Sequence, residues 1–236
     1  MPSRFPTTSW GLVLSADRPT AASRDALGAL CRIYWHPVYS YIRSRGHAAF
    51  DAEDLTQEFF TRLLEKHYLR DVRRERGRFR VFLLASVKHF LANEWDRARA
   101  KKRGGGKAAL PLDIEMAESV YRSEPVDRLT PEVIFERRWA LTLLDRVVGL
   151  LENKSAAAGK AQQFNYLKPF LTGNMPDVSY QQVARELAMT EGAVKMAVHR
   201  MRKQFGELLR AELAEVVADP AEIDDEIRYL LNCVTS

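Results

Sequence analysis

SYQQVARELAMTEGAVKMAVHRM, residues 179–201, is the stretch that most clearly indicates how this chain folds. Ser179 and Thr190 are residue types that cap helices, and each precedes a segment whose apolar residues recur at helical spacing. The positions predicted to face inward are Val183, Ala184, Leu187, Val194, Ala197, Val198 and Met201. Two helices joined by a short turn, here at Ala188-Met189, form a helix-turn-helix, whose second helix enters the major groove of DNA.

The outward face of the second helix carries side chains that suit DNA. Short or flexible polar side chains come first, where base edges would lie, and cations follow, where phosphates would lie. Glu191 is compatible with this assignment, because a carboxylate can accept a hydrogen bond from cytosine. Ala188 stands where many such turns have glycine, and left-handed backbone there would strain an alanine. The candidate DNA-contacting residues are Thr190, Glu191, Lys195, His199, Arg200 and Lys203. A plain helical hairpin within a bundle is the alternative.

Helical patterns extend through the rest of the chain, and no segment shows convincing strand alternation. The glycines at 104–106 and the prolines that follow them interrupt these patterns and indicate a linker. The sequence therefore predicts an all-α protein of two small helical domains joined by a linker, the second containing the helix-turn-helix. The predicted divisions are a first domain at 1–103, a linker at 104–130, a second domain at 131–212 and a helical extension at 213–236.

Local signals predict several helix boundaries. Pro37 is expected to interrupt the first long helix, because proline removes a backbone donor. Asp51 is expected to cap the next helix. Thr130-Pro131 predicts a helix start with proline in the first helical position. The small residues from 153 to 160 predict a loop.

The helix predicted after Asp51 has an acidic face opposite its apolar side. The residues that share this face are Asp54, Gln57, Glu58 and Thr61. Leu55 and Phe59 lie on the opposite side of the helix. An acidic face in a basic protein suits a protein partner with a basic surface. Ordinary solvated helix surface is the alternative.

Charge is unevenly distributed along the chain. The formal net charge is +5 and the pI is about 9.2. From Arg70 to Lys107 there are 13 Lys/Arg against 4 Asp/Glu, an excess of 9, so the rest of the chain is net acidic. Segregation of this kind indicates a surface for nucleic acid. A solvated helix with basic ends is the alternative.

Several classes of function lack support in the sequence. No apolar run approaches the roughly 20 residues that span a bilayer, and no secretion signal is evident, so we expect no membrane partner. Cys31 and Cys233 lie far apart, and the five histidines show no metal-ligand spacing. The glycines that precede Lys107 lack the hydroxyl residue and the strand of a phosphate-binding loop. We therefore expect a protein that is not an enzyme and needs no metal or cofactor.

Three segments in order resemble the extracytoplasmic-function group of RNA polymerase sigma factors. DAEDLTQEFF at 51–60 resembles that family's polymerase-binding segment. GRFRVFLL at 77–84 resembles the start of its helices that melt and bind the minus-ten element. Residues 179–205 resemble its helix-turn-helix for the minus-thirty-five element. The resemblance covers roughly residues 25–103 and 131–210, and three segments in the family's order are far more specific than any one of them.

The resemblance implies a cytoplasmic transcription initiation factor whose partners are RNA polymerase core and promoter DNA. Members of the group are often held by an anti-sigma factor, although nothing in this sequence identifies one. The implied polymerase-binding residues, which would dock on a coiled coil of the largest subunit, are Asp51, Asp54, Gln57, Glu58 and Thr61. The implied minus-ten residues are His89, Asn93, Trp95, Arg97 and Arg99. The implied minus-thirty-five residues are the six DNA-contacting candidates of the helix-turn-helix. Trp95 could stack on an unpaired base, or it could be a core tryptophan.

Two other functions remain open from the residues alone. A conventional helix-turn-helix repressor or activator would explain residues 179–205 but not the acidic segment or the basic helix before the linker. A metal-dependent nuclease would use Asp54 and Glu58 to hold a divalent ion. A helix cap and a protein-docking face explain those carboxylates more simply.

The tail outside the resemblance is predicted to form a helix from Asp219-Pro220. Its apolar residues form a single stripe, which consists of Ile223, Ile227, Leu230 and Val234. A lone stripe must be buried against something, so we expect the helix to pack on one of the two domains. A further hypothesis is that it covers a DNA-binding or polymerase-binding face.

Overall fold

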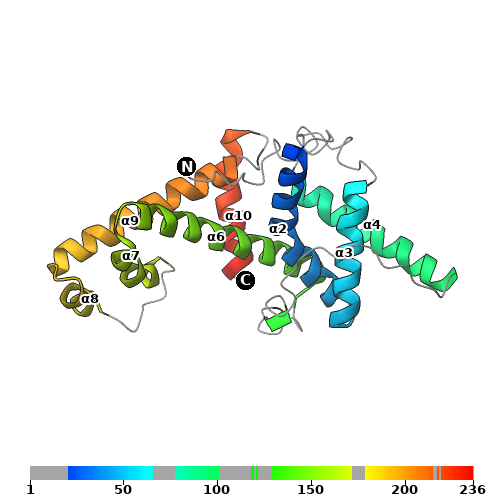
Figure 1. Cartoon of the computed structure of the whole chain (residues 1–236), viewed down its shortest axis with the longest axis horizontal. Coiled ribbons are helices and arrows are strands. Elements are labelled where there is room, and N and C mark those ends of the chain that lie inside the picture. Colours follow the sequence, from blue (N-terminus) through cyan, green and yellow to red (C-terminus); the bar gives the residue numbers. More distant parts are fainter. Residues whose placement is uncertain are drawn as a thin grey trace. The chain divides into compact units, whose positions relative to one another are not determined.

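The structure, a computed structural model, describes residues 21–65, 78–100, 118–119, 121, 129–171, 179–214, 217 and 219–235. Every regular element in these ranges is a helix (Figure 1), which confirms the predicted all-α class. None of the described helices is both long enough and apolar enough to cross a membrane. The leader before residue 21 and most of the predicted linker lie outside the described residues.

The long helices are α2 (Ala21–Ser44), α3 (Ala49–Glu65), α4 (Phe79–Ala100), α6 (Pro131–Ala157) and α9 (Glu191–Ala214). The shorter elements are α7 (Ala161–Leu167), the 3-10 turn η3 (Lys168–Phe170), α8 (Tyr180–Glu186), the 3-10 turn η4 (Pro220–Glu222) and α10 (Ile223–Thr235). By internal contacts the chain divides into unit 1, residues 1–142 and 213–236, and unit 2, residues 143–212. This division assigns residues 131–142 and the tail to unit 1, whereas the sequence-based boundaries, which stay a prediction, begin the second domain at 131.

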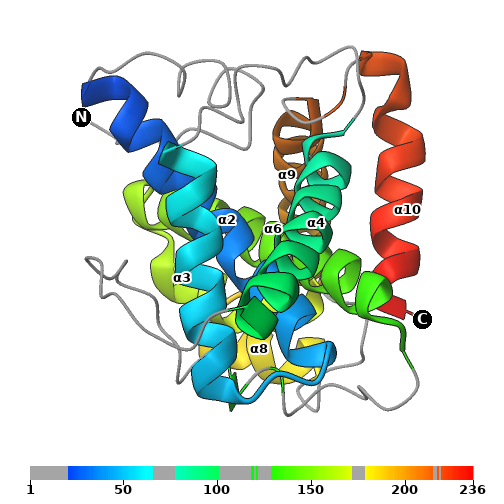
Figure 2. The ribbon, with the colours of Figure 1, turned by 90° about the vertical axis from the view of Figure 1, so that its right-hand side faces the viewer.

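Unit 1 is built on contacts between the aromatic side chains of its helices. α2 and α3 pack side by side (Figure 2). Tyr34 of α2 meets Phe79 of α4 edge-on, with ring centroids 5.2 Å apart. Phe59 of α3 meets Phe90 of α4 at 5.6 Å, also edge-on. Such edge-to-face pairs add to the free energy gained by burying apolar surface. The α3–α4 pair therefore forms a firm support for the acidic face.

The predicted interruption at Pro37 is wrong, because α2 continues through it. Proline inside a helix costs about 3 kcal/mol or more through its missing donor and its ring. Here Trp35, Val38 and Tyr39 around it are all buried. Burial of several large side chains outweighs the local cost. The helix ends at Ser44, and Gly46 follows it with a φ of +93°.

Two other predicted boundaries also differ from the structure. α3 begins at Ala49, so Asp51 lies in its first turn and is not the cap. A carboxylate in the first turn still favours the helix through its dipole. The predicted loop at 153–160 is mostly helix, because α6 runs to Ala157 before Gly159 takes a φ of +69°. Alanine is a strong helix former, and its run here extends α6.

The predicted starts of α6 and of the tail helix are confirmed. Thr130 Oγ1 accepts a hydrogen bond from the backbone N–H of Val133 at 3.3 Å. Asp219 Oδ1 accepts one from the N–H of Ala221 at 2.9 Å. Within the apolar stripe of α10, Leu230 is fully buried and the other three residues are half-buried. α10 therefore packs on unit 1, as a lone stripe requires.

Candidate protein and nucleic-acid interfaces

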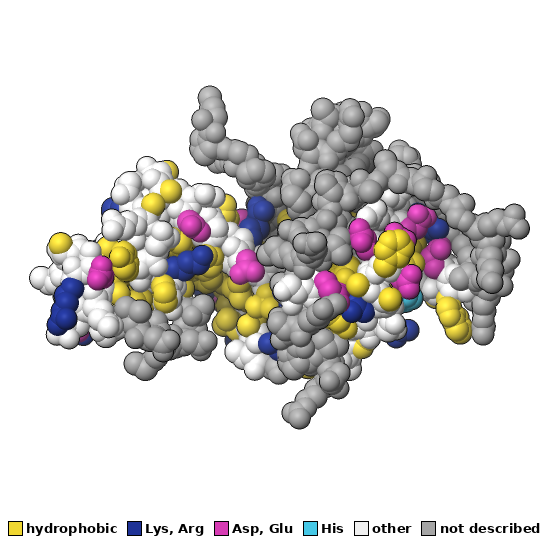
Figure 3. Space-filling view, turned by 60° about the horizontal axis from the view of Figure 1, so that its bottom comes forward, with side chains coloured by type: hydrophobic (Ala, Val, Ile, Leu, Met, Phe, Trp, Pro, Cys, Tyr) yellow, Lys and Arg dark blue, Asp and Glu magenta, His cyan; other side chains and the backbone are white. Residues whose placement is uncertain are grey.

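The predicted acidic face lies on the side of α3 that points away from the core. Asp51 and Asp54 are exposed, whereas Gln57, Glu58 and Thr61 are half-buried. Figure 3 shows acidic side chains gathered around exposed apolar side chains in this part of unit 1, at the right of the view. The helix thus presents carboxylates to solvent while its other side holds it on α2 and α4.

Asp51 and Asp54 are the members of this face with the fewest internal constraints. Neither forms an ion pair within the described part of the chain. Gln57 Nε2 donates to Glu53 Oε1 at 3.3 Å, and Thr61 Oγ1 donates to the carbonyl of Gln57 at 2.8 Å. The carboxylate pair at 51 and 54 is therefore available to a cationic partner.

Glu58 is held by Arg62, which also ties α3 to α4. Arg62 Nε lies 2.6 Å from Glu58 Oε1, and Arg62 Nη1 pairs with Glu94 of α4. The guanidinium lies over the Phe90 ring, 5.2 Å from its centroid. Burial alone would lower the pKa of Arg62, but the hydrogen bonds that it donates to Glu94 and Glu58 outweigh burial and raise the pKa. Glu58 therefore presents only part of its charge to a partner.

A hollow of about 910 Å³ brings the acidic face next to the predicted minus-ten tryptophan. Asp51, Asp54 and Leu55 line it from α3, and Leu91 and Trp95 line it from α4. Trp95 is 64% exposed, so the core-tryptophan alternative is wrong. An exposed indole beside an open hollow can stack on a planar ligand.

The three predicted minus-ten residues with described side chains, His89, Asn93 and Trp95, lie on two different faces of α4. His89 and Asn93 are exposed and four residues apart, so they share one helix face. Trp95 is six residues from His89, which turns it about 120° away at roughly 100° per residue. Arg97 and Arg99 lie within α4, but their side chains are outside the described residues.

The described cations between 78 and 88 are engaged in ion pairs within unit 1. Lys88 Nζ lies 2.8 Å from Glu132 Oε1 at the start of α6. This hydrogen bond raises the pKa of Lys88 and lowers that of Glu132. Arg78 pairs with Glu226, and Arg80 pairs with Glu136 and Glu226. These three cations therefore add little free charge to the described surface of unit 1.

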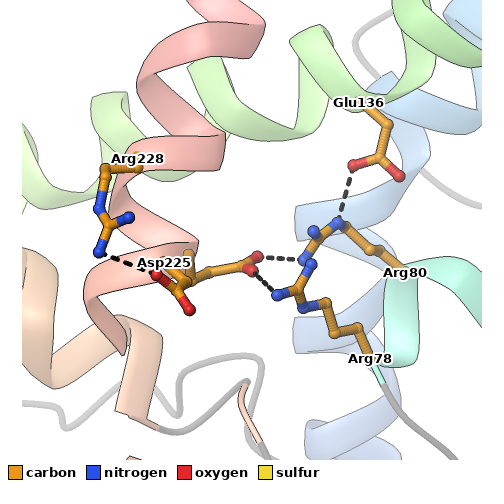
Figure 4. A network of polar contacts seen from close by, with 6 residues as sticks. Arg78, Arg80, Glu136, Asp225 and Arg228 are labelled. Carbon is orange, nitrogen blue, oxygen red and sulfur yellow. Dashed lines mark hydrogen bonds and ion pairs between the residues drawn. The ribbon is translucent and has the colours of Figure 1, made fainter. Parts of the chain in front are cut away.

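Arg80 is the centre of a buried ionic network that sequence reasoning missed (Figure 4). It is 1% exposed; its Nε lies 2.7 Å from Glu136 Oε2, and its Nη1 pairs with Glu226 of α10. Arg78 Nη2 reaches the other oxygen of Glu226 at 2.7 Å. The guanidinium of Arg80 lies 4.3 Å from the Trp139 ring centroid. Glu226 lies between the apolar positions 223, 227 and 230 of α10, and that placement is the signal that could have revealed it.

The pair α8 and α9 in unit 2 has the predicted caps and turn. Ser179 Oγ accepts from the N–H of Gln182 at 3.2 Å, while Gln182 Oε1 accepts from the N–H of Ser179 at 2.8 Å, a reciprocal capping box. Thr190 Oγ1 accepts from the N–H of Ala193 at 3.2 Å. Ala188 has a φ of +51°, so the turn is left-handed at the alanine.

The inward positions predicted for this pair are buried, apart from Leu187, which is half-buried. They pack with Leu151 of α6 and with Phe164, Leu167 and Phe170 of the α7–η3 segment. All six predicted DNA-contacting residues of α9 and its cap are exposed. α9 therefore presents its polar face outward from a well-packed support.

Two cations of this region are already engaged in the structure. Lys195 Nζ lies 2.7 Å from Glu191 Oε1, and 5.7 Å from the ring centroid of Tyr180 on α8. Arg202 donates from Nε and Nη2 to the carbonyl of Phe170 at 2.9 and 2.7 Å. Arg202 therefore fastens α9 to η3.

Comparison with known proteins supports the resemblance. The chain is 26% identical over 193 residues to a curated protein of Streptomyces coelicolor, the ECF RNA polymerase sigma factor BldN. The matched region covers 82% of this chain and 64% of that protein. The predicted similarity to extracytoplasmic-function sigma factors is thereby confirmed. No protein-family model matches the chain, and no solved structure matches it.

Proposed function

We propose that this chain is a sigma factor of the extracytoplasmic-function group, which directs RNA polymerase core to promoters in the cytoplasm and catalyses no reaction itself. The observation that carries the proposal is the similarity to a sigma factor over 82% of the chain. The placement of carboxylates on α3 and of cations on α9 is what such a role requires, since one surface must meet a protein and the other DNA.

The proposed polymerase-docking face consists of Asp51, Asp54, Gln57, Glu58 and Thr61. Asp51 and Asp54 contribute most of its charge, because Glu58 is partly neutralised by Arg62. The half-buried amide of Gln57 and hydroxyl of Thr61 offer hydrogen bonds at the edge of the carboxylates. A basic surface on polymerase would complement this face and speed encounter.

The proposed minus-ten surface lies on α4. Trp95 offers an exposed indole on which an unpaired base can stack, and stacking of this kind is worth about 1–3 kcal/mol per base. His89, Asn93, Arg97 and Arg99 would contact other parts of the melted strand. Because Trp95 and Asp54 line one hollow, the docked polymerase would border the base that Trp95 holds.

The proposed minus-thirty-five reader is the helix-turn-helix formed by α8 and α9. Thr190, Glu191 and Lys195 lie at the start of α9, where base edges are within reach in the major groove. His199, Arg200 and Lys203 follow, where phosphates lie. Two weak DNA contacts held by one polymerase gain affinity through effective concentration, so neither contact needs to be strong alone.

Transcription in vitro tests the proposal. A bacterial core RNA polymerase is supplied with a library of duplex promoter fragments, with and without the full chain. We expect transcripts with discrete start sites that depend on the added chain. Absence of any chain-dependent start would contradict the proposal. Tight binding to a specific duplex without polymerase would instead favour the conventional repressor or activator.

A further inference from the structure

A cationic hollow lies at the turn between α6 and α7 in unit 2. Its volume is about 220 Å³. Its polar lining includes Lys154, Lys160, Arg200, Gln163 and Gln204, while Phe164 and Met201 contribute apolar surface. No carboxylate is among the described residues that line it. Three cations and two amides around one opening favour an anion with several oxygen acceptors.

Hydrogen bonds within the turn fix the backbone of Lys160. The N–H of Lys160 donates to the carbonyl of Ser155 at 2.9 Å. The N–H of Gly159 donates to the carbonyl of Ala156, also at 2.9 Å. This pattern is a Schellman motif, with Gly159 at the left-handed position that it requires. The carbonyl of Lys160 then accepts from the N–H of Phe164 at 2.9 Å, where α7 begins. The backbone of the turn therefore loses little entropy when a ligand binds, and the entropy cost falls on the lysine side chains.

The three cations have no counter-ion within the described residues. Lys154, Lys160 and Arg200 are exposed, and none of them takes part in an ion pair there. Lys195 and Arg202, in contrast, are both engaged by groups of unit 2. The hollow is thus a site of uncompensated positive charge beside the recognition helix.

The hollow lies on the flank of α9 away from α8. Lys195 contacts Tyr180 of α8, and Arg200 is five residues further along, which turns it about 140° around the helix at roughly 100° per residue. The major groove is about 12 Å wide and has a phosphate backbone on each side. A helix lying in the groove must therefore present both of its flanks to phosphates.

We propose that the α6–α7 turn is a second phosphate-binding element, in which Lys154 and Lys160 act with Arg200 to hold the DNA strand on the side of the major groove away from α8. The proposal rests on the proposed function of α9 as a major-groove reader. In this proposal Lys154 and Lys160, which lie outside the helix-turn-helix, contact phosphates. Such a contact positions the protein on DNA and carries no sequence information.

The salt dependence of duplex binding tests this proposal. The full chain is titrated onto two fluorescein-labelled duplexes of unrelated sequence at several salt concentrations between about 50 and 200 mM. Each lost phosphate contact lowers the slope of log affinity against log salt by about 0.9. We expect Lys154→Gln and Lys160→Gln each to lower the slope by about that amount, and the double variant by about twice as much. Affinity should fall several-fold and equally on both duplexes.

Lys168→Gln is the control, because Lys168 is exposed, carries the same charge and is not among the residues lining the hollow. Unlike the two lysines of the hollow, it has an acidic partner, Glu152, at 3.9 Å. Its slope should equal that of the wild type. An unchanged slope in the double variant would overturn the proposal, as would an equal drop in the control or a wild-type chain that does not bind duplex DNA. Co-purification with core polymerase, measured in parallel, should be unaffected by the lysine variants. Failure of the wild type to co-purify would count against the proposed function and not against this site.

Discussion

Arg80 and Glu226 form an ion pair that is almost fully removed from water, so each depends on the other. Replacing Glu226 with alanine would leave the guanidinium of Arg80 buried with Glu136 as its one acidic partner among the described residues. Loss of one partner from a buried pair costs about 3–5 kcal/mol. We expect Glu226→Ala to lower the free energy of unfolding of unit 1 by that order, as measured by urea denaturation.

Asp225→Ala is the control for this prediction. Asp225 is the chain neighbour of Glu226, but its ion pair with Arg228 at 2.9 Å is exposed on both sides. Exposed pairs are worth about 0–1 kcal/mol. Equal losses for the two variants would show that Glu226 has no special role in the stability of unit 1.

Ala188 provides a second prediction for a single residue. Its φ of +51° lies in the left-handed region, which costs an L-residue with a Cβ about 1–2 kcal/mol. Glycine avoids this cost but loses more entropy on folding. We expect Ala188→Gly to stabilise the chain by about 0.5–1 kcal/mol in the same urea assay. Gly159→Ala, at a φ of +69° with open space around its Cβ, should change stability in the opposite direction.

The sequence predicts the burial and the partners of some residues but not of others. The buried positions of α8 and α9 follow from apolar spacing within a short segment, so periodicity is sufficient. Arg80 and Glu226 are 146 residues apart, and nothing local to Arg80 indicates its partner. The sequence also does not predict whether Trp95 is buried or exposed, because a tryptophan on a helix fits both a core and a stacking surface.

Individual elements follow local signals except where packing opposes them. The caps at Thr130, Ser179, Thr190 and Asp219 act through hydrogen bonds within three residues, and these helix starts were predictable. Pro37 lies in α2 because the side chains around it are buried, and that burial depends on helices far away in sequence. The hollow between α3 and α4 likewise could not be predicted from the sequence, since it depends on how two helices are placed relative to each other.

The tail helix α10 gives a prediction for a whole element. Removing residues 219–236 deletes Glu226 and Leu230 together and exposes the apolar surface that they cover. We expect a larger drop in Tm for this deletion than for Glu226→Ala, as measured by thermal unfolding. Transcription in vitro separates the roles of the tail. Higher activity at a temperature where the truncated chain is folded would support a covering role, whereas unchanged activity would restrict α10 to stability.

The start of α9 gives another prediction for an element. Glu191 neutralises Lys195 and also repels phosphates, so it limits how strongly this turn of α9 attracts DNA. Glu191→Gln should raise the affinity for any duplex several-fold and steepen its salt dependence. Fluorescence anisotropy at two salt concentrations measures both effects. A fall in affinity on one sequence alone would instead indicate that Glu191 contacts a base there.

At the scale of the whole molecule, acidic and basic side chains lie on separate surfaces. Two exposed carboxylates on α3 are available for a protein partner, whereas the cations of α9 and of the α6–α7 turn face outward from unit 2. The sequence alone indicated the carboxylates of α3 and the cations of α9, because they fall in different segments, but it did not indicate the cations of the α6–α7 turn. It did not indicate that residues 131–142 and the tail would pack with unit 1, since that assignment follows from contacts between distant segments.

Association with a bacterial core RNA polymerase that lacks its own specificity subunit tests the central claim most directly. The wild-type chain is compared by pull-down with Asp51→Lys/Asp54→Lys, which reverses two exposed charges that have no internal ion pair in the described residues. Glu222→Lys/Asp225→Lys, on exposed positions of η4 and α10, makes the same change in net charge. Both variants remove a first-turn carboxylate, Asp51 from α3 and Asp225 from α10. We predict that the wild type and this control bind core polymerase and that the α3 variant, with a Tm no lower than that of the control, does not. Failure of the wild type to bind, or undiminished binding by the α3 variant, would contradict the account.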